Sequence, residues 1–218
     1  MIKILQKEFL DYYGLTGTQY HVPFYTSSGD IIEHDEKACR ECKKKEMQQC
    51  YGDNEKQNLI IHSKHEITVI DIETFLNQFI GRKAGTGRKC DLIAYDLEKI
   101  LFVDMYCGYQ KGLIPHDVKT NEGIKNKSGK IADAREQITS TFDKLYVVPS
   151  LQTKLDSFKV KEGLFANRKK KYSNDEDKVM RNMGVFMEIA ALSSRGLYSN
   201  LSHDIKFMQI DYPEKYNW

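Results

Sequence analysis

The alternation of hydrophobic and polar positions is clearest between residues 90 and 108, where two short apolar runs flank a polar loop. Residues 92–95 and 100–106 are mostly apolar and β-prone, and residues 96–99 are mainly polar. This spacing predicts a β-hairpin with a four-residue loop. Because both faces of the two runs are apolar, we expect the hairpin in the interior of a sheet that helices cover on both sides.

The rest of the chain shows weaker patterns of the same two kinds. Helical spacing of apolar residues predicts helices at residues 71–80, 131–146 and 176–192, the first with Asp71 as its N-cap. β-prone runs predict strands at residues 58–61, 66–70, 160–166 and 205–210, and Ser28 begins a turn that leads into another. Residues 111–130 are polar and lysine-rich, and we expect an inserted loop there. The sequence therefore predicts a single α/β domain over residues 1–218, a sandwich with a central mixed β-sheet flanked by helices.

The composition agrees with one globular domain. Of 218 residues, 40% are hydrophobic and 29% charged, and the net charge of +2 neither requires nor excludes a nucleic-acid partner. The N-terminus lacks the apolar region of a signal peptide, and no apolar run approaches the length of about 18 residues that spans a bilayer. We therefore expect a cytoplasmic protein without membrane contact. Five cysteines, an odd number, argue against a disulfide framework.

The hairpin pattern also predicts which acidic residues meet. If Tyr95 pairs with Ile100, the same register places Asp91 opposite Asp104, with Cβ atoms about 4.5–5.5 Å apart. Two like charges at that distance destabilise the strand pair unless a cation such as Mg²⁺ or Mn²⁺, or protonation of one carboxyl, relieves them. Alternatively, both carboxylates lie at an exposed strand end and are hydrated.

The residues around this pair resemble a known family. Cys90-Asp-Leu-Ile-Ala-Tyr and, after a turn, Ile100-Leu-Phe-Val-Asp-Met-Tyr resemble the core hairpin of the PD-(D/E)XK nuclease superfamily. In that family an Asp opens one strand, and a Glu or Asp followed two residues later by Lys lies on the next. A helix with an inward Gln commonly follows, which matches Gln137, and an earlier helix often supplies another acid, for which Glu73 is the candidate. The resemblance spans residues 71–145 and implies a restriction-endonuclease-like core at about 71–166.

The resemblance implies a metal-dependent phosphodiesterase that acts on DNA or RNA. Asp91 and Asp104 would hold Mg²⁺ or Mn²⁺ with Glu73 in support, and Gln137 would position the site. From the residues alone, Gln137 is equally well a partly exposed helix residue. Since such nucleases are frequent in defence systems, a role in prokaryotic antiviral defence, with a partner protein of the same system, is a further expectation.

One position departs from the family pattern. Tyr106 stands where the motif lysine is expected. A neutral phenol cannot supply the positive charge that would stabilise the negative charge developing on the phosphate. Either another lysine takes its place, with Lys111, Lys119 and Lys130 nearby in sequence, or the chain is inactive. An inactive nuclease-fold protein would serve as a nucleic-acid-binding or protein-interaction module.

Two further groups of residues suggest ligands. In an N-terminal extension, residues 28–57, His34, Cys39, Cys42 and Cys50 form a set that suits structural zinc, with His62 or His65 as alternative fourth ligands. Free thiols on a solvated helix are the other interpretation.

A basic, glycine-rich loop leads into Asp91. Its Arg82, Lys83, Arg88 and Lys89 are candidates for phosphate contacts, and residues 168–171 form a second basic run. A solvated charged surface is the alternative for both. The glycine spacing does not fit a Walker motif.

Overall fold

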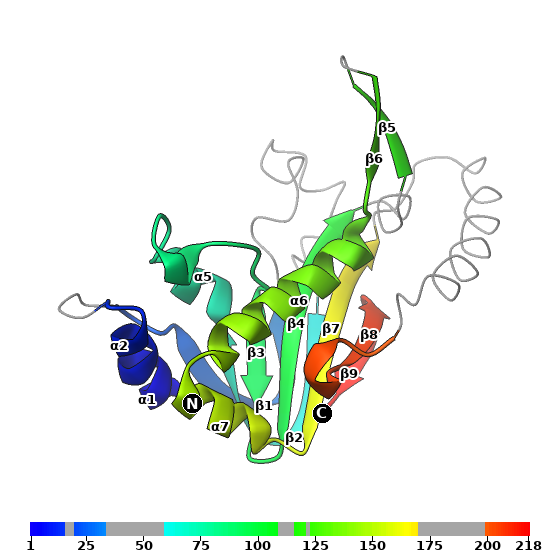
Figure 1. The fold of residues 1–218 in the computed structure, drawn as a ribbon. Coiled ribbons are helices and arrows are strands. Elements are labelled where there is room, and N and C mark those ends of the chain that lie inside the picture. The colour runs from blue at the N-terminus through cyan, green and yellow to red at the C-terminus, as the bar shows by residue number, and fades with distance from the viewer. Residues whose placement is uncertain (16–19, 34–58, 109–115, 121–122, 170–198) are drawn as a thin grey trace.

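The computed structural model describes residues 1–15, 20–33, 59–108, 116–120, 123–169 and 199–218 (Figure 1). Its main sheet has seven strands in the order β1-β2-β3-β4-β7-β8, and β9 pairs with β2 beside this path. Their bounds are β1 Phe24–Glu33, β2 Leu59–Asp71, β3 Leu92–Tyr95, β4 Lys99–Gly108, β7 Val160–Lys169, β8 Lys206–Asp211 and β9 Lys215–Asn217. Strands β1 to β4 pair antiparallel, whereas β4, β7 and β8 are parallel, so the sheet is mixed as predicted.

The predicted hairpin is confirmed in position and register. Tyr95 pairs with Ile100 and Leu92 with Val103, which is the register that the loop length requires. Strand β2 flanks β3 and strand β7 flanks β4, so the hairpin lies inside the sheet. This central place explains why both of its faces are apolar.

Helices flank the sheet, as the sequence predicts. They are α1 (Ile2–Ile4), a π-helical turn (Leu5–Phe9), α2 (Leu10–Tyr12), α5 (Ile72–Asn77), α6 (Lys130–Tyr146) and α7 (Pro149–Asp156). Short 3-10 turns lie at Lys83–Gly85 and Ser202–Asp204. Asp71 caps α5, since its Oδ1 accepts from the amide of Thr74 at 2.8 Å, but α5 ends three residues earlier than predicted. Within the described residues, no helix is long and apolar enough to cross a membrane.

Apolar clusters fill both faces of the sheet. The described helices contribute residues such as Phe75 and Phe142 to one cluster, where they meet Phe102 of β4. On the other face, Leu92 and Val103 belong to a second buried cluster. Helix α6 runs across β4 and β7 (Figure 1) and forms, with α7, the connection that makes these two strands parallel.

Three local predictions were wrong. The two short strands expected at residues 58–61 and 66–70 are one strand, β2, which pairs with β1 on both sides of a register shift at residues 64–66. Its histidines are matched by acids: His62 lies 2.7 Å from Asp30 and His65 lies 2.9 Å from Asp96. The turn expected at Ser28 is instead a bulge inside β1, where Gly29 adopts a φ of 80°.

The third correction concerns the lysine-rich loop at residues 111–130. It contains a separate hairpin of β5 (His116–Thr120) and β6 (Gly123–Lys127), and Lys130 already belongs to α6. The pattern hid this hairpin because its strands have few apolar residues and do not join the main sheet. The helix expected at residues 176–192 lies outside the described residues.

Candidate functional site

Asp91 and Asp104 lie at one level of the hairpin. Asp91 immediately precedes β3, and its backbone amide donates to the carbonyl of Val103 at 2.9 Å. Its carboxylate reaches across the strand pair, where Oδ2 accepts from the amide of Met105 at 2.6 Å. The side chain of Asp91 is therefore fixed against the residue that follows Asp104.

The environment of the pair is not a hydrated strand end. Asp104 is 5% exposed, and Asp91 is half-buried. Burial raises the pKa of the neighbouring Cys90 thiol well above its usual range, and although Thr141 opposes this, the charges of Asp91 and Asp104 raise it further. Asp91 and Asp104 therefore both lie close enough to the Cys90 thiol for their charges to raise its pKa, and a cation held by the two carboxylates would offset that negative charge.

Gln137 connects helix α6 to this acidic pair. Its side-chain amide faces two acceptors, so we assign the amide nitrogen to that side, where it donates to Oδ1 of Asp104 at 3.0 Å and to the carbonyl of Lys89 at 2.5 Å. One turn later, Thr141 accepts from the amide of Cys90 at 2.9 Å. Helix α6 therefore holds both the entry to β3 and the buried carboxylate on β4.

Glu73 approaches from the other side, on the first turn of α5. Its amide donates to the carbonyl of Asp91 at 3.2 Å. Its carboxylate accepts from Asn77 at 3.2 Å, and Asn77 in turn accepts from Lys89 at 3.0 Å. The backbone of Glu73 is thus tied to Asp91, while its side chain belongs to a polar chain that reaches the basic loop.

A cavity of about 380 Å³ opens between these elements. Its lining carries three cationic and two acidic side chains together with one amide: Glu73, Gly87, Arg88, Lys89, Lys130, Asp133 and Gln137. The formal charge of this lining is +1, and the oxygens of an anionic ligand such as a phosphodiester would contact its cationic groups. Asp91 and Asp104 are not among the lining residues.

Lys130 lies next to the residue that replaces the motif lysine. Its Nζ is 5.6 Å from the ring centre of Tyr106 and 3.2 Å from Oδ2 of Asp133. Tyr106 stacks on the buried Phe165 with ring centres 6.3 Å apart. Of the three lysines considered as replacements, Lys111 is outside the described residues and Lys119 lies on β5, so Lys130 is the one that the structure places beside Tyr106.

The structure divides the basic loop. Arg88 lines the cavity and pairs with Asp133 at 2.8 Å and Glu136 at 3.2 Å, and Lys89 lines it as well. Arg82 lies elsewhere, where it donates to the hydroxyl of Tyr20 at 2.7 Å, and Lys83 is exposed on its 3-10 turn. The first half of the predicted phosphate-binding set is therefore separated from the second.

Positive charge also gathers behind the cavity. Burial, and then the charge of Lys89, lower the pKa of Lys144 on α6 to about 8. The ammonium of Lys144 donates to the carbonyl of Thr86, which fixes the basic loop on the helix.

The predicted zinc ligands His34, Cys39, Cys42 and Cys50 lie outside the described residues. The alternative ligands His62 and His65 lie on β2, and each is close to an aspartate of another segment, Asp30 and Asp96 respectively. In the described part of the chain, no three or more His, Cys, Asp or Glu side chains come together as a metal-binding group. The acidic site thus offers a pair of carboxylates, not a triad.

The basic run at residues 168–171 begins at the end of β7, and its remainder is not described.

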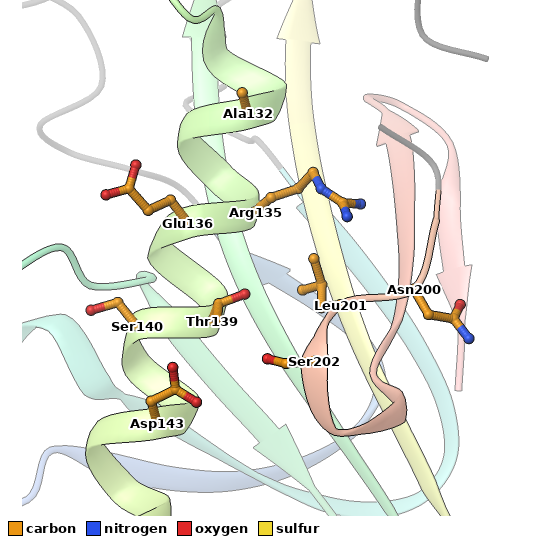
Figure 2. Close-up of a pocket in the computed structure, with 9 residues that line it drawn as sticks. All are labelled: Ala132, Arg135, Glu136, Thr139, Ser140, Asp143, Asn200, Leu201 and Ser202. Carbon is orange, nitrogen blue, oxygen red and sulfur yellow. The ribbon is translucent and has the colours of Figure 1, made fainter. Parts of the chain in front are cut away.

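A second hollow of about 660 Å³ lies along α6, between that helix and residues 200–202 (Figure 2). Figure 2 shows Glu136 and Ser140 extending to one side of the helix, while Arg135 points towards the segment of Asn200. Arg135 donates to the carbonyl of Ser199 at 2.7 Å and covers the ring of Phe207 at 5.0 Å. Because these polar side chains point in different directions, they are not arranged to contact one ligand atom together.

The sequence reasoning missed Asp133, Asn77 and Thr141. A signal for two of them was present, because Asp133, Gln137 and Thr141 repeat every four residues and form a polar stripe on a helix that is otherwise apolar on that side. Comparison of the chain with family models, curated proteins and solved structures finds no match.

Proposed function

We propose that this protein is a metal-dependent, nuclease-like phosphodiesterase that acts on DNA or RNA, with Lys130 in the role that Tyr106 cannot fill. The observation that carries the proposal is the convergence of four side chains at one end of the hairpin. The buried Asp104 is held by Gln137, Asp91 is fixed beside it, and Lys130 covers Tyr106.

The donor set fits a hard divalent cation. Mg²⁺ and Mn²⁺ prefer carboxylate oxygens, and Mg²⁺ is commonly bound by one or two carboxylates together with water and substrate phosphate. A carboxylate has about four lone-pair sites, so the hydrogen bonds to Asp91 and Asp104 are compatible with metal ligation. Bound there, the cation would lower the pKa of a water and polarise the scissile phosphate.

The protein's own groups would position the substrate. Gln137 orients Asp104, and Glu73 supports the backbone of Asp91. Lys130 is 45% exposed at the side chain, so its ammonium is accessible to a phosphate that enters the cavity. Because Asp133 accepts from both Arg88 and Lys130, one carboxylate keeps two cations aimed at the same space.

A second candidate is an inactive nuclease-fold module that binds nucleic acid or a partner protein. Tyr106 favours it, as does the limitation of the acidic site, within the described residues, to two carboxylates. A role in prokaryotic defence is compatible with either candidate and rests on how often nucleases of this type occur there.

Cleavage assays separate the two candidates. The full chain is incubated with Mn²⁺ or Mg²⁺ and duplex DNA, single-stranded DNA or RNA, and compared with Asp104→Asn and with Asp11→Asn, an exposed control on α2. We expect cleavage by the parent and the control, and a loss of at least about 100-fold in Asp104→Asn, the size typical of losing a transition-state electrostatic group. Binding without cleavage on every substrate would leave the inactive module.

A further inference from the structure

The hairpin of β5 and β6 is a structural unit of its own. Its five ladder pairs, from His116–Lys127 to Thr120–Gly123, form a two-stranded sheet apart from the main one. It is inserted between β4, which carries Asp104, and α6, which begins at Lys130. Figure 1 shows it projecting past the end of the sheet at which β4 stops and α6 starts. The hairpin is therefore joined directly to the strand that carries Asp104 and, at its other end, to the helix that carries Lys130 and Gln137.

The inserted segment also concentrates positive charge. Residues 109–129, between β4 and α6, hold four lysines against two acids, Asp117 and Glu122, a formal net charge of +2, which equals that of the whole chain. Three of these lysines are Lys119 on β5 and Lys125 and Lys127 on β6. The hairpin contributes no strand to the main sheet, and three lysines along its two strands suit an anionic partner.

The dimensions of the hairpin point to a duplex. Each strand of five residues spans about 16 Å, and a two-stranded β-ribbon fits the major groove of B-form DNA, which is about 12 Å wide. Residues 116–127 contain no Phe, Tyr or Trp, the side chains on which single-stranded bases stack. The deep, narrow major groove of an RNA duplex does not admit such a ribbon.

The exposed side chains near the tip agree with this geometry. Lys125 is exposed, and the adjacent Ile124 is 69% exposed, which is unusual for a large apolar side chain on a polar hairpin. In a major groove, an apolar side chain contacts thymine methyl groups while neighbouring lysines contact phosphates.

We propose that this hairpin inserts into the major groove of duplex DNA and holds the duplex against the acidic site. The inference rests on the proposed function, because it assigns the substrate class of the same site. It makes duplex DNA, and not single strands or RNA, the substrate.

Binding measured by fluorescence anisotropy tests this. The probes are a 20-base-pair DNA duplex, the matching single strand and the matching RNA duplex, over a range of NaCl concentrations without divalent metal. The test variant is Lys119→Gln/Lys125→Gln/Lys127→Gln, and the control is Lys7→Gln/Lys64→Gln/Lys206→Gln, three exposed lysines on other elements. We expect the test variant to bind duplex DNA at least 10-fold more weakly and its salt slope to fall by about 2–3, since each phosphate contact adds about 0.9.

Each outcome decides one question. Equal duplex affinity and salt slope in the parent and the test variant would overturn the inference, as would tighter binding of the single strand or the RNA duplex by the parent. Mn²⁺-dependent cleavage by the same proteins is scored separately. Hairpin-dependent duplex binding without any cleavage contradicts the proposed function alone, whereas cleavage with hairpin-independent binding contradicts this inference alone.

Discussion

The ammonium of Lys130 lies over the ring of Tyr106, 5.6 Å from its centre, and Asp133 pairs with it at 3.2 Å. A cation over an aromatic face is attracted by the ring, so the tyrosine supports the charge that it does not itself carry. Tyr106 follows Asp104 by two positions on β4 and so points to the same face. The ammonium of Lys130, the first residue of α6, thus lies beside the strand position at which the resemblance expects a lysine.

Replacing Gln137 by Ala should affect both stability and cleavage. It removes a hydrogen bond to the buried Asp104, and such bonds to charged groups contribute about 1.5–3 kcal/mol. Urea denaturation should show a loss of that size, and the cleavage rate should fall because Asp104 is no longer oriented. Gln152→Ala, at an exposed glutamine on α7, is the matched control. A stability equal to that of the control would mean that Gln137 does not hold Asp104.

Asp133→Asn should separate substrate binding from catalysis. The substitution removes a negative charge that pairs with Arg88 and Lys130, so DNA affinity should rise two- to fivefold, an order-of-magnitude expectation for one charge near phosphates. The maximal cleavage rate should fall about 10-fold, because Lys130 loses the partner that aims it. Steady-state kinetics distinguish these effects. A rise in KM without loss of kcat would show that Asp133 does not position Lys130.

Asp96, in the turn between β3 and β4, should make stability depend on pH. Burial raises its pKa, but hydrogen bonds, first from Trp218, outweigh burial and lower the pKa to about 2. A carboxyl with a lowered pKa stabilises the fold above its unfolded value near 4, and this contribution disappears as the pH falls from 4 to 2. Asp96→Asn should therefore cost about 2 kcal/mol at pH 6 and little at pH 2. Urea denaturation at both values checks this, and a pH-independent cost would contradict it.

The zinc site at His34, Cys39, Cys42 and Cys50 stays a prediction. Mass spectrometry under native conditions should show one zinc ion per chain, and Cys42→Ser should remove it because a tetrahedral site needs all four ligands. Cys90→Ser, at a buried thiol beside the acidic site, is the control that should retain the metal. A metal-free parent protein would leave the free-thiol interpretation.

The central part of the fold followed from the sequence because its signal is local. The loop between residues 95 and 100 fixes the register, and the register fixes which residue faces Asp104. The sequence indicated Gln137 as a candidate site residue only through the resemblance. Its bond to Asp104 was not predicted, because that bond depends on how α6 crosses the sheet.

Other parts could not be predicted, for physical reasons that differ. Strand β2 continues through His62 and His65 because acids on neighbouring segments pair with them, and these partners are distant in sequence. The hairpin of β5 and β6 has few apolar residues and forms a sheet of its own, so it leaves no alternating pattern of apolar and polar positions. Tyr106 and Lys130 are separated in the sequence by this whole hairpin. No spacing rule therefore indicated which of the three lysines would lie beside Tyr106.

The central claim is that Lys130 supplies the positive charge of a working nuclease site. The decisive measurement is the rate of Mn²⁺-dependent duplex cleavage by the parent, Lys130→Gln, the double variant Lys130→Gln/Tyr106→Lys and the exposed control Lys7→Gln, with folding of each checked by circular dichroism. We expect Lys130→Gln to be at least about 100-fold slower than the parent and the control, and the double variant to recover at least about 10-fold, because it returns the charge from the strand. A parent that cleaves nothing, or a Lys130→Gln variant as fast as the parent, would contradict the account.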